Sequence, residues 1–243
     1  MVDVINSIFQ NEDLKIIQKD NMLKYSLDSV LLANFVTINK KTKNILDIGT
    51  GNAPIPLLIS KRTEANITAV EIQEESYGLA KKSIKMNNLD NKIKLYNMDV
   101  FDFSKDSETD VYDVIVCNPP YFKMNENSKL NDSELKTIAR HEKTLDIRAI
   151  FKISKKLLKN NGYVSIVHRP ERLIDIIEAM KLNNIEPKRI LFIHPYEGKE
   201  ANIMLIEGAK NGKPGVKILD SIYANDRFGK YTNEIKNYCK IIK

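Results

Sequence analysis

The feature that most constrains the fold is a regular alternation of apolar, β-branched runs with runs of helical periodicity. The strand-like runs are 44–48, 67–71, 92–97, 111–117, 162–168, 189–193 and 202–207. The helix-like runs between them are 55–62, 74–87, 145–159 and 170–183. Parallel strands need long crossover connections, which helices usually supply. The alternation therefore predicts an α/β fold with a mostly parallel, seven-stranded sheet and helices on both faces.

The segments that flank this alternation predict further features. A segment rich in glycine and proline, 211–215, leads into a short apolar run at 216–219. We interpret it as a hairpin return into an edge strand, and so expect an antiparallel edge. Near the other end, the run 25–32 is typical of a helix start capped by Asp28. We expect one domain over residues 1–243, because no linker divides the chain.

Composition argues against several classes of protein. No run of about 18 apolar residues is present, and the first residues lack the basic-then-apolar order of a secretory signal. We therefore expect a cytoplasmic protein that does not enter membranes. The two cysteines, Cys117 and Cys239, lack metal-ligand spacing, so we expect neither a disulfide framework nor a metal site. The oligomeric state cannot be inferred from these patterns, and a monomer is favoured.

The formal net charge of +6 is concentrated in a basic tail, residues 210–243, which holds eight Lys and Arg residues against three acids. Aromatic residues alternate with these cations, a pattern that suits phosphate contacts and base stacking, and makes Lys236 and Lys240 candidate RNA contacts. The alternative is a C-terminal helix whose apolar residues pack on the sheet while its lysines face solvent, and both can hold together. The aromatic residues are Tyr223, Phe228, Tyr231 and Tyr238.

The first predicted strand leads into a glycine turn, Gly49-Thr50-Gly51. Two glycines let the backbone pass close to a bound molecule. A dinucleotide fingerprint has a third glycine, where this chain has Ala53, so pyrophosphate binding is disfavoured and a φ below zero is expected at Ala53. Asp47 lies near the end of the strand, and its carboxylate suits a cationic ligand better than an anionic pyrophosphate.

Two further acids follow the next two strands. Glu71 ends the second strand, where its carboxylate can accept from both hydroxyls of a ribose. Asp99 follows the third strand, where it can accept from an adenine amino group, although each acid alone could instead cap the following helix or turn. S-adenosylmethionine, a nucleoside with a positive centre, fits this array better than NAD or FAD. The expected cofactor-binding residues are Asp47, Gly49, Gly51, Asn52, Glu71, Ile72, Asp99, Val100 and Asn118.

The tetrapeptide Asn118-Pro119-Pro120-Tyr121 follows the fourth strand, at the sheet edge where open α/β sheets bind ligands. A planar amine is a poor nucleophile because its lone pair is delocalised. The side-chain oxygen of Asn118 and the carbonyl of Pro119 can each accept one N–H and so localise that pair. Tyr121 can stack on a flat substrate, with Phe122 as the opposite wall. We therefore predict the four residues of the tetrapeptide to be catalytic.

These motifs together resemble the class I S-adenosylmethionine-dependent methyltransferases that modify planar amino groups. A fuller set resembles the bacterial adenine N6-methyltransferases of valine tRNA, which act on adenosine 37. That set consists of 25–33 (YSLDSVLLA), 47–51 (DIGTG), 118–122 (NPPYF), 139–142 (ARHE), 168–173 (HRPERL) and 231–234 (YTNE).

The resemblance implies a Rossmann-like class I methyltransferase fold, S-adenosylmethionine as cofactor, and methyl transfer to N6 of an adenosine in tRNA. It also implies that Tyr25 and Asp28, within an N-terminal extension over 1–43, close over the cofactor. Arg140, His141 and Arg169 are implied to lie near the RNA.

Four alternatives remain open. A glutamine N5-methyltransferase would accept a carboxamide in the same motif, but that family has a helical domain before the glycine turn, and only 46 residues precede Asp47. A DNA adenine methyltransferase would add a target-recognition domain. A non-catalytic RNA-binding module should have lost Asn118 or the acids. An NAD-dependent oxidoreductase needs a Tyr/Lys or His catalytic pair, which we cannot assemble from this sequence.

Overall fold

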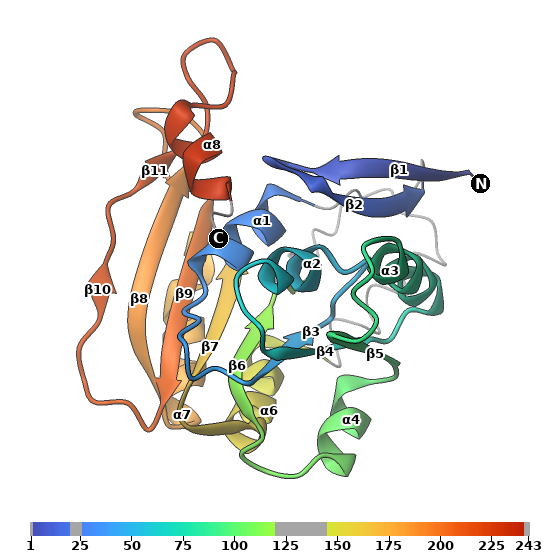
Figure 1. The fold of residues 1–243 in the computed structure, drawn as a ribbon. Coiled ribbons are helices and arrows are strands. Elements are labelled where there is room, and N and C mark those ends of the chain that lie inside the picture. The colour runs from blue at the N-terminus through green and yellow to red at the C-terminus, as the bar shows by residue number, and fades with distance from the viewer. Residues whose placement is uncertain (1, 20–25, 120–144, 241–243) are drawn as a thin grey trace, which may run out of the picture.

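A computed structural model describes residues 2–19, 26–119 and 145–240. Within them, a nine-stranded sheet has the order β10-β8-β9-β7-β6-β3-β4-β5, with β11 also paired to β8 (Figure 1). All seven predicted strands are present, at nearly the expected positions. The strands are β3 (Asn44–Ile48), β4 (Asn66–Glu71), β5 (Ile93–Asn97), β6 (Tyr112–Cys117), β7 (Leu158–His168), β8 (Ile185–His194), β9 (Ile203–Lys210), β10 (Lys217–Ile218) and β11 (Ile222–Tyr223).

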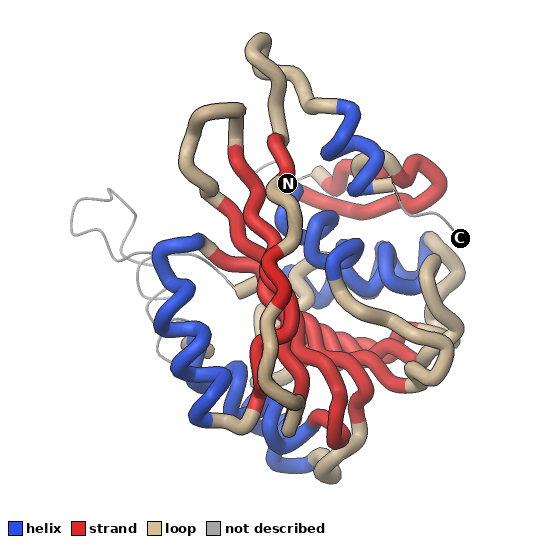
Figure 2. Tube along the Cα trace, turned by 90° about the vertical axis from the view of Figure 1, so that its left-hand side faces the viewer, coloured by secondary structure: helices blue, strands red, loops and turns tan. Residues whose placement is uncertain are grey.

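Helices cover both faces of the sheet, as predicted (Figure 2). Successive residues of a strand point to opposite faces, so Val114 and Val116 of β6 join one apolar cluster while Ile115 and Cys117 join the other. The first cluster also contains α1 (Leu27–Phe35), α2 (Pro54–Ser60), α3 (Glu74–Met86) and α8 (Asn233–Cys239). The second contains α4 (Val100–Asp106), α6 (Ile147–Leu157) and α7 (Leu173–Leu182), the last preceded by the 3-10 turn η1 (Pro170–Arg172).

The antiparallel part of the sheet arises differently from the hairpin predicted at 211–219. Strand β9 lies antiparallel between β7 and β8. Both of its edges are therefore already hydrogen-bonded, and the following chain cannot return beside it. Instead it continues to the outer side of β8, where β10 and β11 pair in parallel. The predicted short edge strand exists, but the predicted hairpin is wrong.

The N-terminal segment forms a hairpin, β1 (Asp3–Ile8) and β2 (Asn11–Lys19), which the sequence pattern did not predict. Hydrogen bonds attach β2 to α3 and to its C-cap, Asn87. The Ile17 N–H donates to Ser83 Oγ at 2.9 Å, the Lys15 N–H donates to Asn87 Oδ1 at 3.0 Å, and Asn87 Nδ2 donates to the carbonyl of Lys15 at 2.6 Å. The hairpin therefore lies over the helices that follow the glycine turn.

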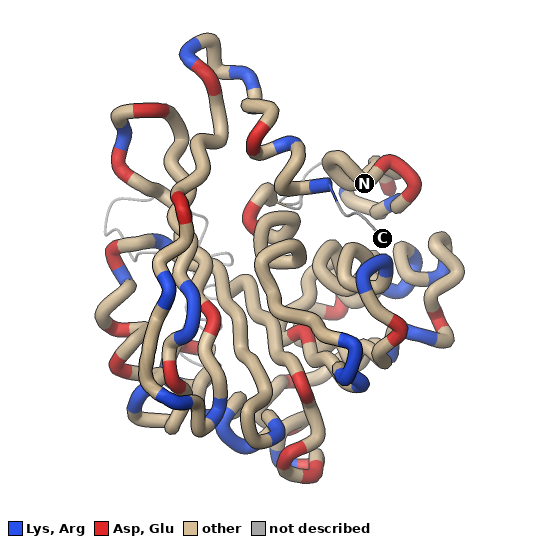
Figure 3. The backbone as a smooth tube through the Cα atoms, turned by 60° about the vertical axis from the view of Figure 1, so that its left-hand side comes forward, with Lys and Arg blue, Asp and Glu red and all other residues tan. Residues whose placement is uncertain are grey.

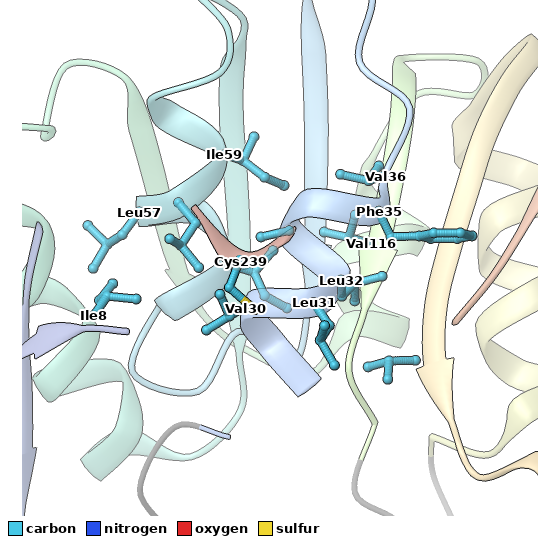
Figure 4. Close-up of a cluster of buried hydrophobic side chains, with 14 of the residues drawn as sticks. Ile8, Val30, Leu31, Leu32, Phe35, Val36, Leu57, Ile59, Val116 and Cys239 are labelled. Carbon is cyan, nitrogen blue, oxygen red and sulfur yellow. The ribbon is translucent and has the colours of Figure 1, made fainter. Parts of the chain in front are cut away.

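Helix α1 begins with Ser26 as its N-cap, so the predicted cap at Asp28 is wrong. Ser26 has the extended backbone of a cap residue, whereas Asp28 already lies in the first turn, where its carboxylate interacts favourably with the helix dipole. The helix packs closely on the rest of the fold, because Val30, Leu31 and Leu32 are fully buried in the first cluster (Figure 4).

The basic tail contains a packed helix. In α8, Ile235 and Cys239 are buried, and burial raises the pKa of Tyr238 far above its usual range. Lys236 is half-buried and Lys240 is exposed. The packing interpretation of the tail is thus confirmed, and Tyr238 is partly buried against the first cluster. None of the helices in the described ranges is long and apolar enough to cross a membrane.

Candidate active site

The glycine turn is fastened to the neighbouring strand at the carboxyl edge of the sheet. The N–H groups of Gly49 and Thr50 donate to the carbonyl of Val70 at 2.9 and 3.0 Å. The Gly51 N–H donates to Glu71 Oε2 at 2.8 Å. Gly49 and Gly51 have φ values of +69° and +58°, and a Cβ at either position would meet no atom within 4 Å. The turn therefore exposes bare backbone to open space, as a close-fitting ligand requires.

Ala53 has a φ of +70°, so the prediction of a φ below zero there is wrong. The residue is the N-cap of α2, directly before Pro54, and the Ala53 N–H closes the turn on the carbonyl of Thr50 at 3.0 Å. A residue before proline avoids the right-handed helical region. The turn thus keeps the left-handed geometry of a third glycine, at a cost of roughly 1 kcal/mol for the alanine.

Gly51→Ala is expected to lower the free energy of unfolding by about 1 kcal/mol, because its φ of +58° is unfavourable for alanine while space is available. Gly78→Ala is the matched control. Gly78 lies inside α3 and also has nothing within 4 Å of an added Cβ, so alanine should stabilise the protein by about 1 kcal/mol. Urea unfolding of both variants checks the opposite signs. Destabilisation by both would contradict the open geometry.

Asp47 is the most unusual charged group at this edge. It is 1% exposed, and neither carboxylate oxygen makes a well-formed hydrogen bond. Burial raises its pKa to about 7, the neighbouring Thr50 side chain opposes this rise, and the nearby Glu71 carboxylate adds to it. The Thr50 hydroxyl is also buried, and its contact with Asp47 falls short of good hydrogen-bond geometry. Buried polar groups without well-formed hydrogen bonds are costly, so this pair fits a bound ligand that brings a positive charge and N–H donors, as S-adenosylmethionine does.

Two other predicted cofactor residues make hydrogen bonds within the protein. Glu71 Oε2 accepts from the Gly51 N–H, and Oε1 accepts from the Gln73 N–H, both at 2.8 Å. The ribose role of Glu71 remains a prediction. Asp99 caps α4 by accepting from the Phe101 N–H at 2.8 Å. The capping alternative therefore holds for Asp99, whose role toward adenine stays untested.

Three neighbours of these acids differ in their surroundings. The Asn52 amide donates to the carbonyl of Ile17 at 3.0 Å and so joins the glycine turn to β2. Ile72 is 44% exposed directly beyond Glu71, and is available as an apolar wall. Val100 is buried in the second cluster. Of the three, Ile72 keeps the geometry expected of a ligand contact.

Asn118 follows β6, which is the immediate neighbour of β3, so the amide lies beside the glycine turn. Its Nδ2 donates to Ser29 Oγ at 3.0 Å. Ser29 is 4% exposed in the first turn of α1, next to the buried Asp28. Sequence analysis missed Ser29, although its place beside Asp28 was a signal. Pro119 is also buried. The predicted residues Tyr25, Pro120, Tyr121, Phe122, Arg140 and His141 lie outside the described residues.

Arg169 follows β7, on the other side of β6, and donates to the carbonyl of Asn202 at 2.6 Å. His168 precedes it, and its Nδ1 accepts from the Arg169 N–H at 2.8 Å. Burial lowers the pKa of His168 to about 4, so it is neutral at physiological pH. Lys236 lies on α8 and Lys240 is the C-cap of that helix, which packs against α1. In the described part of the chain, no three His, Cys, Asp or Glu residues are grouped to hold a metal ion.

Comparison with known proteins agrees with this geometry. The model of the methyltransferase small domain family matches residues 26–180. A Flavobacterium psychrophilum protein named tRNA1(Val) (adenine(37)-N6)-methyltransferase is 28% identical over 88% of this chain and 92% of its own length. A protein of the same name from Aliivibrio salmonicida is 30% identical over 75% of each chain.

Among solved structures, a protein from Agrobacterium tumefaciens described as a predicted O-methyltransferase superposes with a TM-score of 0.68. It is 19% identical, and the match covers 88% of this chain and 98% of that one. This likeness confirms the Rossmann-like methyltransferase fold. From the family model and the curated relatives, the chain belongs to the methyltransferase small domain family, and to the tRNA1(Val) (adenine(37)-N6)-methyltransferases in particular.

Proposed function

We propose that this protein transfers a methyl group from S-adenosylmethionine to N6 of an adenosine in tRNA, namely adenosine 37 of tRNA(Val). The observation that carries the proposal is the placement of the Asn118 amide beside the glycine turn and the buried Asp47 carboxylate. A site for a cationic nucleoside thus adjoins acceptors for a planar amine. The names of the curated relatives support the choice of adenine in tRNA.

On the cofactor side, Asp47 would receive the ammonium group, and Gly49 and Gly51 would allow close approach of the backbone. Glu71 would accept from the ribose hydroxyls, and Ile72 would contact the adenine ring. When bound, S-adenosylmethionine supplies an electrophilic methyl group. The burial of Asp47 strengthens its attraction to a cation, because few water molecules screen the charge.

On the reacting side, the oxygen atoms of Asn118 and Pro119 would each accept one N–H of the target amine. This would hold the nitrogen in a tetrahedral arrangement with its lone pair localised. By analogy with oxyanion-hole donors, each such acceptor contributes on the order of 3 kcal/mol. The methylated amine becomes acidic and can lose its proton to water, so a strong base is not essential.

The test is methyl transfer from radiolabelled S-adenosylmethionine to unmodified tRNA(Val), followed by nucleoside analysis. We expect N6-methyladenosine, and no labelling of a transcript with guanosine at position 37. Label on a release factor instead would support the glutamine alternative. RNA binding without any transfer would support the non-catalytic module, and either result would overturn the proposal. With tRNA as substrate, the protein is proposed to act in the cytoplasm, as a monomer.

A further inference from the structure

We propose that the loop 224–232, between β11 and α8, binds single-stranded RNA by stacking a base on Phe228. The inference rests on the proposed function, because it names how the same substrate is held away from the reacting amine. We call residues 224–232 the stacking loop. Four observations carry the inference: the loop is hydrogen-bonded internally, its aromatic ring is exposed, a cation adjoins the ring, and the loop lies on the active-site edge.

The stacking loop has a fixed internal structure. Asp226 Oδ1 accepts from the N–H groups of Phe228 and Lys230, at 2.9 and 3.0 Å. The Asp226 N–H donates to the carbonyl of Lys230 at 2.8 Å, and Gly229 turns the chain with a φ of +76°. The carboxylate of Asp226 is thus directed at the loop's own N–H groups. Such a turn presents Phe228 without a large entropic cost of ordering on binding.

The base of the stacking loop is attached to the end of β8. The N–H groups of Ala224 and Asn225 donate to the carbonyls of His194 and Pro195, at 2.8 and 3.0 Å. Thr232 closes the loop, with its hydroxyl donating to the carbonyl of Tyr223 at 2.7 Å. The loop therefore extends the central sheet as a fixed projection (Figure 1).

Phe228 is 73% exposed at the tip of this ordered loop. Folding does not require an apolar ring in that position, since little of it is buried. The guanidinium of Arg227 lies 4.8 Å from the ring centroid, which makes a combined aromatic and cationic surface. Tyr196 is 41% exposed beside the loop, its hydroxyl 3.9 Å from where a Cβ on Gly229 would lie. Tyr223 and Tyr231, at the two ends of the loop, are also partly exposed, and their rings contact His194 and Phe9. Flat rings with adjacent cations suit stacked bases and their phosphates.

The stacking loop lies on the same edge of the sheet as Asn118. Strand β6 is parallel to β7, and β9 is antiparallel to both β7 and β8. Strand β8 therefore runs in the same direction as β6. Both therefore end at the same edge. They are three strand spacings apart, roughly 14 Å. An RNA loop whose target base lies at Asn118 can thus place a nearby base on Phe228. Figure 3 shows Lys and Arg on the projecting loop.

The alternative occupant is a second copy of this chain. The charge of the loop favours RNA, because Arg227 and Lys230 face outward while Asp226 is hydrogen-bonded within the loop. Two copies that met through this loop would place Arg227 and Lys230 of each copy against the same cations of the other, which would repel them.

The test uses the full chain and an unmodified anticodon stem-loop RNA, with a base-paired duplex as the RNA control. Phe228→Ala should weaken stem-loop binding about 10-fold or more, and duplex binding far less. Leu182→Ala is the matched protein control, because Leu182 is 71% exposed at the end of α7, on the opposite edge of the sheet. It should bind both RNAs like the parent. Neither change should alter the melting temperature or the Kd for S-adenosylmethionine.

Phe228→Trp gives a direct readout, because the chain contains no tryptophan. The variant should bind stem-loop RNA as tightly as the parent, and its fluorescence should be quenched on binding. Unchanged binding by Phe228→Ala, or no change in tryptophan fluorescence, would overturn the inference. So would a dimer in solution that Phe228→Ala dissociates. These assays measure binding without turnover, so they are separate from the test of methylation.

Discussion

Asp47→Asn is expected to weaken binding of S-adenosylmethionine strongly while making the protein more stable above neutral pH. The carboxylate is 1% exposed and makes no well-formed hydrogen bond. An amide of the same shape cannot attract the ammonium group, so the cofactor Kd should rise at least about 100-fold, as for loss of a buried charged partner. The same substitution removes a buried charge from the free protein, which should raise its free energy of unfolding by about 2 kcal/mol at pH 8.

The raised pKa of Asp47 determines how its contribution to stability changes with pH. Burial raises the pKa of Asp47 from 3.8 to about 7 in the folded chain. Between these values the folded state binds more protons than the unfolded state, so this group's contribution to stability falls as the pH rises from about 4 to 7. Above pH 7 the contribution is constant. The parent protein should therefore lose stability across this window relative to Asp47→Asn. Cofactor affinity should rise over the upper part of the window, as Asp47 becomes ionised.

Asp113→Asn is the matched control, since Asp113 lies at the start of β6 with both oxygens occupied. It accepts from the Lys43 and Asn44 N–H groups and from Lys159, and these hydrogen bonds outweigh desolvation, so its pKa is lowered. Its substitution should destabilise the protein at pH 8 and spare cofactor binding. Urea unfolding at pH 5 and pH 8, with calorimetric titration of the cofactor, checks both variants. Parent-like cofactor binding by Asp47→Asn would contradict the assigned role.

The sequence was sufficient for the central sheet because its signals are local. Apolar runs separated by amphipathic helices predict parallel strands, and all seven predicted runs form strands near their expected positions. The last of them, β9, follows β8 without a helix and is antiparallel. The N-terminal hairpin lacked such signals. Its turn is formed by Phe9 and Gln10, neither a usual turn residue, and Gln10 takes a φ of +59°. Strand β1 is mostly exposed and carries no apolar run, so only its pairing with β2 reveals it.

The candidate site was predictable in residue type but not in bonding. The acids at the ends of strands could be located from the pattern. Whether Asp99 accepts from Phe101 or from a ligand depends on the local backbone. The burial of the Asp47 carboxylate without a well-formed hydrogen bond depends on the tertiary packing around it. The contact of Ser29 with Asn118 joins residues 89 positions apart. Such contacts are fixed by how α1 packs on the sheet, which no local pattern encodes.

That contact leads to the prediction with the largest effect on turnover. Asn118→Ala removes a proposed acceptor of the target N–H and should lower kcat about 100- to 1,000-fold. The Asn118 amide can rotate about its last torsion unless something holds it. Ser29 accepts from Nδ2 at 3.0 Å, which orients the oxygen away from α1. Ser29 is itself fixed, because the following residues of α1 are buried in the first cluster (Figure 4).

Ser29→Ala should therefore lower kcat by about 5-fold, since one neutral hydrogen bond contributes roughly 1 kcal/mol, and leave the KM for RNA unchanged. Ser29→Thr retains the hydroxyl and should recover most of the loss. Ser154→Ala is the matched control: Ser154 is fully buried in α6, and its hydroxyl has no partner, so the same chemical change should preserve kcat and stabilise the fold slightly.

A purely structural role for Ser29 would lower the melting temperature with kcat intact. If Asn118→Ala is inactive and Ser29→Ala is fully active, the amide is oriented by other contacts. Full activity of both would remove Asn118 from the mechanism.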